Sequence, residues 1–415
     1  MSAMLFACLT RVRMAVSAAS RPSCSSRVEK AIAFVVFAAL LSVCEPARAQ
    51  FTQQGSKLVG TRAVGQLRFS GVNDGPRQGS SVALSGDGNI AVVGGRYGDH
   101  GGVLAWVFSR SGRVWNQQAR LIGTGAVGGF WQTFSVALSA DGNTAIAGGP
   151  GDNDHTGAAW VFTRSGGVWT QQGAKLVGTG AVGDAQQGRS VALSGDGNTA
   201  IVGGPTDDGD KPGTVGSTGA VWIFTRSGGV WTQQGTKLVG TGAVGGAGQG
   251  WSIALSRDGN TAVAGGPYDN HHIGAAWVFT RSDGVWTQQG TKLVATGVVG
   301  VSEQGKSVAL SANGNTAVLG APSTDFSTAT LTATGAARAF TRSGGVWTQQ
   351  GSKLVGTGAV GAYLGTSPTL SFGGITGAGG AQQGSSVALS GDGSTAVVGG
   401  PLDNDFTGAA WVFIR

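Results

Sequence analysis

Residues 190–205 read SVALSGDGNTAIVGGP, and this stretch decides the fold because the chain repeats it six times. Each copy continues through a variable acidic loop, then GAAWVFTR, SGG and VWTQQGTKLVG, with small departures. A period of 50 to 80 residues indicates an array of identical structural units. The first apolar residues of the six copies are Val82, Val136, Val191, Ile253, Val308 and Val387.

Each copy contains four short segments, which we call a, b, c and d. They are rich in Val, Ala, Thr and aromatic residues and are bounded by Gly, Asp and Asn, a composition typical of strands. Asp196-Gly197 between a and b supplies the positive φ that a tight hairpin turn needs. Segments b and c are apolar almost throughout, so both faces of each sheet should be buried. Four-stranded sheets stacked in this way are propeller blades.

The two ends of the repeat array complement each other. The sixth copy contains segments a to c, whereas residues 51–60, FTQQGSKLVG, match the d segment WTQQGSKLVG at residues 347–356. We therefore predict an all-β, six-bladed β-propeller, closed by an N-terminal strand that completes the last blade. Ten of the twelve tryptophans occupy fixed positions in c and d, which indicates core packing. Trp131 and Trp251 fall outside these positions, and blade five has Arg338 where the others have the Trp of segment c.

Residues 1–49 are organised as a secretory signal. Basic residues precede an apolar run at residues 31–43, and Ala47-Arg48-Ala49 forms an A-x-A cleavage site. We predict a mature domain of residues 50–415, which is periplasmic, secreted or bound to the cell surface and has no transmembrane segment. A transmembrane reading of residues 31–43 is weaker, because a span needs about 20 residues.

Removing the signal changes the charge and the cysteine content. Of 28 basic and 21 acidic residues, 6 and 2 lie before residue 50, so 22 and 19 remain, a net charge of +3. This balance gives no support for a nucleic-acid partner. The three cysteines, Cys8, Cys24 and Cys44, all lie in the signal. We therefore expect a monomer stabilised by packing and ring closure, without disulfides.

The end of segment b carries a family resemblance. Gly320-Ala321-Pro322 matches the Gly-Ala-Pro of FG-GAP repeats, and Gly-Pro stands at the same place in four other copies. The chain thus resembles the propellers of integrin α subunits and of bacterial exported proteins. In this family calcium binds a long acidic loop between a and b, whereas here that joint is a tight turn. The resemblance therefore does not bring the family's calcium site with it.

Oxygen ligands gather instead in the b–c loops of four blades. Hard oxygen donors are what Ca²⁺ prefers, so we hypothesise that some of these loops bind Ca²⁺. The alternative is that the side chains satisfy backbone groups of the loops. The candidate ligands are Asp152, Asn153, Asp154, Asp207, Asp208, Asp210, Asp269, Asn270, Asp403, Asn404 and Asp405.

The sequence offers little sign of catalysis. The four histidines all fall in b–c loops, the mature chain has no thiol, and no carboxylate pair stands out from the repeat. All long insertions fall in the b–c and d–a loops, at residues 206–218, 323–334 and 362–381. Because binding residues gather on variable loops, we predict a non-enzymatic adhesion module that binds protein or glycan with this face. A lectin-like or enzymatic propeller, and a structural surface protein, are the alternatives.

Overall fold

The computed structural model of the chain describes residues 54–61, 67–69, 72–74, 78–95, 104–128, 134–208, 216–297, 300–327, 332–359, 371–372, 375–376 and 380–415. The chain divides into two compact units, residues 1–54 and 55–415, and all of the described strands belong to the second. The predicted signal and its cleavage site lie outside the described residues. Within the described ranges, no helix has the length and apolar character to cross a membrane.

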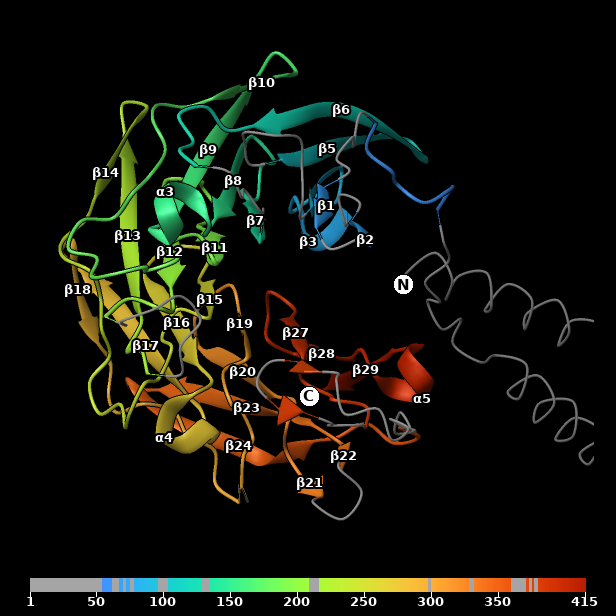
Figure 1. Cartoon of the computed structure of the whole chain (residues 1–415), viewed down its shortest axis with the longest axis vertical. Coiled ribbons are helices and arrows are strands. Elements are labelled where there is room, and N and C mark those ends of the chain that lie inside the picture. The colour runs from blue at the N-terminus through green and yellow to red at the C-terminus, as the bar shows by residue number, and fades with distance from the viewer. Residues whose placement is uncertain are drawn as a thin grey trace, which may run out of the picture. The chain divides into compact units, whose positions relative to one another are not determined.

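Six antiparallel sheets follow one another in chain order around a common centre (Figure 1). The prediction of an all-β, six-bladed β-propeller is thereby confirmed. The first five blades have four strands each, and the sixth has three among the described residues. The blades are β3 (Gln78–Leu84), β4 (Ile90–Gly95), β5 (Leu104–Ser111) and β6 (Val114–Ile122); β7 (Ser135–Leu138), β8 (Thr144–Gly149), β9 (Ala158–Ser165) and β10 (Val168–Gln171); β11 (Ser190–Leu193), β12 (Thr199–Gly204), β13 (Ala220–Ser227) and β14 (Val230–Gln233); β15 (Ser252–Leu255), β16 (Thr261–Gly266), β17 (Ala275–Ser282) and β18 (Val285–Gln288); β19 (Ser307–Leu310), β20 (Thr316–Ala321), β23 (Ala336–Ser343) and β24 (Val346–Leu354); and β27 (Ser386–Leu389), β28 (Thr395–Gly400) and β29 (Ala409–Ile414).

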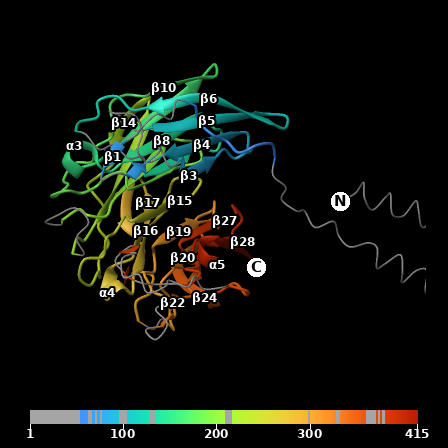
Figure 2. The same cartoon turned by 45° about the vertical axis from the view of Figure 1, so that its right-hand side comes forward.

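The smaller elements lie in the loops between these strands. Three two-stranded hairpins accompany the blades, and three four-residue helical turns stand in b–c loops. Figure 2 shows two of these turns, α3 and α4, together at one side of the blades. The hairpins are β1 (Leu67–Phe69) with β2 (Val72–Asp74), β21 (Phe326–Ser327) with β22 (Thr332–Ala333), and β25 (Ser371–Phe372) with β26 (Ile375–Thr376); the turns are α3 (Asp152–His155), α4 (Asp269–His272) and α5 (Asp403–Phe406).

Strand a is the innermost strand of every blade. The a strands of consecutive blades, from β3 to β27, contact one another, and each a strand pairs with b in its own blade. Because the strands alternate in direction, the b–c and d–a loops share one face of the propeller, which we call the loop face. The a–b and c–d turns share the opposite turn face. Residues that immediately precede strand a therefore stand on the loop face, closest to the axis.

The hydrophobic core lies between blades. Ile146 and Val161 of blade two pack with Val191, Val202 and Trp222 of blade three, and all five side chains are buried. Because each sheet is covered on both faces, strands b and c carry apolar residues without alternation. This packing explains the continuous apolar runs of the sequence.

The Trp of strand c requires glycine in the preceding blade. Trp222 is fully buried, and its Nε1 donates a hydrogen bond to Thr179 O at 2.9 Å. A Cβ on Gly178 would lie 2.0 Å from Trp222 Cδ1, closer than any real contact. Neither member of this pair is present at blade five. Arg338 stands at the Trp position, and Ala295 of the preceding blade stands at the Gly position. Arg338 is 2 % exposed, so its side chain is buried like the tryptophan it replaces.

Backbone hydrogen bonds join the a–b turns of all six blades on the turn face. In the turns of blades one to five, one amide donates to a carbonyl of the next turn, at 2.8–2.9 Å. The links run from Gly86 N to Ala140 O, Ala140 N to Gly195 O, Gly195 N to Arg257 O, Arg257 N to Ala312 O, and Ala312 N to Gly391 O.

The joint between blades six and one differs from the other five. Val82 of blade one is 67 % exposed, whereas its counterpart Val136 is 7 % exposed. Val412 of blade six is 66 % exposed, whereas Val161 at the same place is 1 % exposed. Residues 51–53, which we expect to pair with β29, lie outside the described residues. The segment that follows them does reach blade one, since Gly60 lies against Trp106 as Gly178 lies against Trp222.

Candidate functional site

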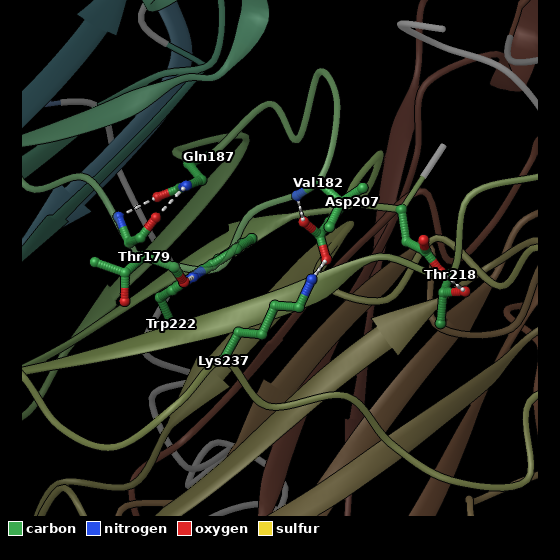
Figure 3. Close-up of polar contacts among 9 residues, drawn as sticks. Thr179, Val182, Gln187, Asp207, Thr218, Trp222 and Lys237 are labelled. Carbon is green, nitrogen blue, oxygen red and sulfur yellow. Dashed lines mark hydrogen bonds and ion pairs between the residues drawn. The ribbon is translucent and has the colours of Figure 1, made fainter. Parts of the chain in front are cut away.

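The first aspartate of the b–c loop is a structural residue in three blades. Asp207 Oδ1 accepts a hydrogen bond from Val182 N at 2.8 Å, and its Oδ2 lies 2.5 Å from Lys237 Nζ (Figure 3). Asp152 and Asp269 repeat both contacts, with Lys175 and Lys292 as their cations. All three aspartates are at most 1 % exposed. Both carboxylate oxygens thus hold the b–c loop to the preceding d–a loop and to segment d.

The other predicted calcium ligands do not assemble around a common point. Asn153, Asp154 and Asn404 are exposed residues with left-handed backbone, as is Asp208, which accepts a hydrogen bond from Thr218 Oγ1 at 3.4 Å. Asn270 is half-buried, Asp403 is buried, and Asp210 and the side chain of Asp405 lie outside the described residues. No group of three acidic, His or Cys residues that could hold a metal is found in the described ranges.

A different set of residues departs from the repeat close to the axis. The residue immediately before the SVAL or SIAL segment of strand a changes from blade to blade, and we call these six positions the axial row. From blade one to blade six they are Ser80, Phe134, Arg189, Trp251, Lys306 and Ser385. Blades two to five thus alternate aromatic rings and cations at one structural position.

The large members of the axial row stack on one another. The Arg189 guanidinium carbon lies 4.8 Å from the centre of the Phe134 ring and 3.9 Å from that of Trp251. Lys306 Nζ lies 4.6 Å from the centre of the Trp251 ring. Both distances to Trp251 are within the range of cation–π attraction. Since Arg189 and Lys306 come from the blades on either side of Trp251, the stack runs from blade to blade.

One carboxylate stands beside this stack. Glu303 is 4 % exposed, its Oε1 lies 3.2 Å from Lys306 Nζ, and its Oε2 accepts a hydrogen bond from Ser323 Oγ at 2.9 Å. Its backbone is left-handed, with φ of 54°. At this position, three residues before the axial row, the other blades have Arg77, Trp131, Gln186, Gly248 and Gln382. Glu303 is therefore a carboxylate at a position where none of the other five blades has one.

The b–c loop of blade four completes the cluster. The Tyr268 ring meets Trp251 edge-on, with centres 5.2 Å apart, and meets His272 edge-on at 5.1 Å. His272 O accepts the backbone N–H of Glu303 at 2.8 Å. Burial, assisted by the nearby Glu303 charge, raises the pKa of Tyr268 to about 12, so its hydroxyl is protonated at neutral pH. His271, in contrast, is exposed, so the two neighbouring histidines do not form a pair.

These residues, which we call the axial cluster, combine the elements of a binding or catalytic site. A guanidinium, an ammonium and a phenol ring contact one indole ring. A carboxylate contacts the ammonium, and an imidazole contacts the phenol ring. The sequence hypothesis missed the cluster because it searched loops for repeated donors. A comparison of the six copies position by position would have found both features. The axial row is one such position, and Glu303 lies three residues before it.

Two comparisons of sequence give no family. No protein-family model matches the chain, and no curated protein matches it. The resemblance to FG-GAP repeats therefore stays a prediction.

Solved structures share the fold. A protein from Lactobacillus plantarum is 16 % identical with a TM-score of 0.51, and the match covers 83 % of each chain. The periplasmic gluconolactonase of Pseudomonas aeruginosa is 15 % identical with a TM-score of 0.51, and the match covers 81 % of each chain. At these identities the likeness shows the propeller fold alone.

The second comparison corrects the functional prediction. A propeller of matching extent is a periplasmic enzyme, which overturns the step from this fold to a non-enzymatic adhesion module. The physical reason is that a propeller fold does not decide between binding and catalysis, because function depends on the residues of the site. The chemistry of this chain has to be argued from its own axial cluster.

Proposed function

We propose that the chain is an enzymatic propeller, which hydrolyses the ester bond of a small polyhydroxylated compound, such as a sugar lactone, at the axial cluster. The observation that carries the proposal is Glu303, a buried carboxylate beside Lys306 at a position where no other blade has a carboxylate. Catalytic acids and bases are expected where a site breaks the pattern of its scaffold. The solved gluconolactonase suggests the first substrates to test.

The residues suit a metal-independent hydrolysis. Glu303 accepts a proton from water as the water oxygen forms a bond to the ester carbonyl carbon. The positive charge of Lys306, 3.2 Å from Glu303 Oε1, stabilises the oxyanion that develops. The ester C–O bond then breaks, and the proton moves from Glu303 to the departing alkoxide. The products are one carboxylic acid and one hydroxyl group.

Glu303→Gln tests this assignment. Blades three and six have glutamine at this position, Gln186 and Gln382, so the variant should fold like its neighbours. We expect its kcat on gluconolactone and galactonolactone, followed by pH-stat, to fall about 10²- to 10⁴-fold, the usual contribution of a general base.

Asp258→Asn is the matched control. It makes the same chemical change on the turn face, where blade five has Asn313, and should leave kcat unchanged. Wild-type protein that hydrolyses neither lactone above the buffer rate, or a Glu303→Gln variant as active as wild type, would contradict the proposal. Binding of sugars without turnover would instead indicate a lectin.

We also propose that the protein is exported. The three-part layout of residues 1–49 supports this, as does the absence of cysteine after residue 49. N-terminal sequencing of protein recovered from the periplasm or the medium should begin at Gln50. An intact N-terminus on cytoplasmic protein would contradict it.

A further inference from the structure

Blade five contains a buried arginine that the protein itself satisfies poorly. Arg338 is 2 % exposed, and its Nη1 donates one long hydrogen bond, to Ala337 O at 3.5 Å. Its Nε is buried and has no hydrogen-bond partner among the described residues. Because a guanidinium keeps its proton in proteins, a positive charge is buried at this point. A buried charge without a contacting partner is strongly destabilising.

Asp325 acts on this charge without neutralising it. Burial lowers the pKa of Arg338, and the negative charge of Asp325 opposes this shift. However, Asp325 is 44 % exposed and forms an ion pair with Lys353. The attraction of an exposed and already paired carboxylate is weakened by solvent. Asp325 therefore does not take the place of a counter-ion in direct contact with the guanidinium.

The b–c loop of the same blade contains a second buried polar atom without a partner. Thr324 is 2 % exposed, and its Oγ1 makes no hydrogen bond within the described ranges. Its N–H donates to Ala321 O at 3.2 Å and its carbonyl accepts from Gly335 N at 3.0 Å, the same backbone pattern that holds Asp207 in blade three. Blade five thus has a hydroxyl where blades two, three, four and six have a buried aspartate.

Blade three shows that these two positions face one loop. Trp222 Nε1 donates to Thr179 O at 2.9 Å, and Asp207 Oδ1 accepts from Val182 N at 2.8 Å (Figure 3). Both side chains therefore contact the d–a loop at residues 179–182. Arg338 occupies the place of Trp222 in strand c, and the threonine of blade five occupies that of Asp207. The repeat thus brings the guanidinium and the hydroxyl to the joint between blades four and five.

A small monovalent anion supplies what these two groups lack. A water molecule could accept a hydrogen bond from either group, but it would leave the charge of Arg338 unbalanced. The surroundings are apolar, since Leu319 and Ala295 belong to the core cluster between blades four and five. Burying an ion costs more as its charge rises, so a monovalent anion is favoured over phosphate or sulfate.

We propose that blade five binds a small monovalent anion, such as chloride, between Arg338 Nε and Thr324 Oγ1, where the anion replaces the aspartate of the other blades. The inference is independent of the proposed function. It concerns the packing of two blades, and its tests require no turnover.

Thermal unfolding in sodium chloride and in sodium isethionate, at equal ionic strength, tests the inference in solution. Isethionate has the same charge as chloride but is much larger. We expect the unfolding midpoint to be about 3 °C higher in chloride, because a ligand that binds only the folded state stabilises it. Equal midpoints in the two salts would overturn the proposal.

Thr324→Asp introduces the carboxylate that four other blades have and makes the anion unnecessary. We expect the difference between the two salts to fall below about 1 °C in this variant. Asn313→Asp is the matched control, since it also introduces an aspartate that other blades have into blade five, but in the a–b turn. It should keep the full difference. A Thr324→Asp variant that keeps it too would contradict the proposed site.

Arg338→Trp combined with Ala295→Gly gives a second route to the same result. The double variant restores the Trp–Gly contact of the other blades and removes the buried charge. Its unfolding midpoint should be the same in both salts, and this comparison decides the matter even where Thr324→Asp does not fold. A double variant with an undiminished response to chloride would show that the ion binds elsewhere.

Bromide locates the anion directly. Anomalous scattering from crystals grown in sodium bromide should show a peak within hydrogen-bond distance of both Arg338 Nε and Thr324 Oγ1. A water molecule at this point, or no density there, would overturn the proposal. A bromide peak without an effect of chloride in solution would indicate an adventitious ion only, and it would overturn the proposal as well.

Discussion

Blades three and five are built on the same repeat, yet they treat their charged residues differently. In blade three, Asp207 is 1 % exposed and bound to Lys237, Trp222 packs on Gly178, and Gln187 clamps Gly178 through both its amide atoms. In blade five, Asp325 is 44 % exposed, arginine replaces the tryptophan, and a carboxylate stands next to the axis. Blade three shows what the repeat needs in order to fold. Blade five shows where it can be changed, and therefore where function can arise.

The largest difference should appear at the aspartate–lysine pair. Asp207→Ala leaves Lys237 and the Val182 amide without their partner at a buried site, so we expect a loss of about 3 kcal/mol in the free energy of unfolding. Asp325→Ala removes an exposed partner of Lys353 and should cost about 1 kcal/mol or less. Urea denaturation of both variants measures this contrast. Equal losses would mean that burial does not distinguish the two pairs.

The next difference concerns the Trp–Gly contact. Gly178→Ala forces a methyl group into the Trp222 ring and should destabilise the protein by about 1–3 kcal/mol, as overpacking of a core does. Ala295 of blade four already stands at this position next to blade five, and there the ring is absent, because blade five has Arg338 in place of the tryptophan. Ala295→Gly should therefore change stability by about 1 kcal/mol or less. Urea denaturation measures the stability of both variants. A Gly178→Ala variant as stable as wild type would show that the Trp222 ring can move aside.

The smallest difference should be seen in acid. Burial raises the pKa of Asp196 in the a–b turn of blade three. Hydrogen bonds from Ser194 and Asn198 outweigh this effect and lower the pKa below its ordinary 3.8. A lowered folded-state pKa stabilises the protein above pH 3.8, and this contribution is lost as the pH falls through the folded-state value. Blade five has Asn313 there, which does not titrate.

Asp196→Asn copies that turn and checks the sign. We expect the variant to lose less stability than wild type between neutral pH and pH 3, as measured by thermal unfolding across the pH range. A steeper loss in the variant would show that the carboxylate is not stabilised in the folded state. The effect of one turn should be small, because Asp196 is exposed.

The fold was predictable because strand composition and turn residues recur in register. The Asp-Gly of each a–b turn and the apolar b and c segments predict the strands that the structure shows. The sequence did not reveal the ion pairs of the loop aspartates, for a physical reason. Their partner lysines follow 23 residues later in blades two and four, so a local reading sees free ligands where the fold makes ion pairs.

The axial cluster was hidden for a related reason. Arg189, Trp251 and Lys306 are 62 and 55 residues apart in the chain, and only the circular arrangement of the blades makes them neighbours. The sequence does contain the signal, as differences among six copies at one position. Reading the chain for what recurs finds the scaffold, whereas reading it for what fails to recur finds the candidate site.

The hydrogen bonds that link the a–b turns have an evolutionary consequence. Each link joins one main-chain amide to one main-chain carbonyl, whatever side chain the turn has: glycine, alanine or arginine. A duplicated blade inserted at any of these five joints would meet the same donor before it and the same acceptor after it. A gene encoding this protein could thus gain or lose whole blades by recombination without first evolving a new interface.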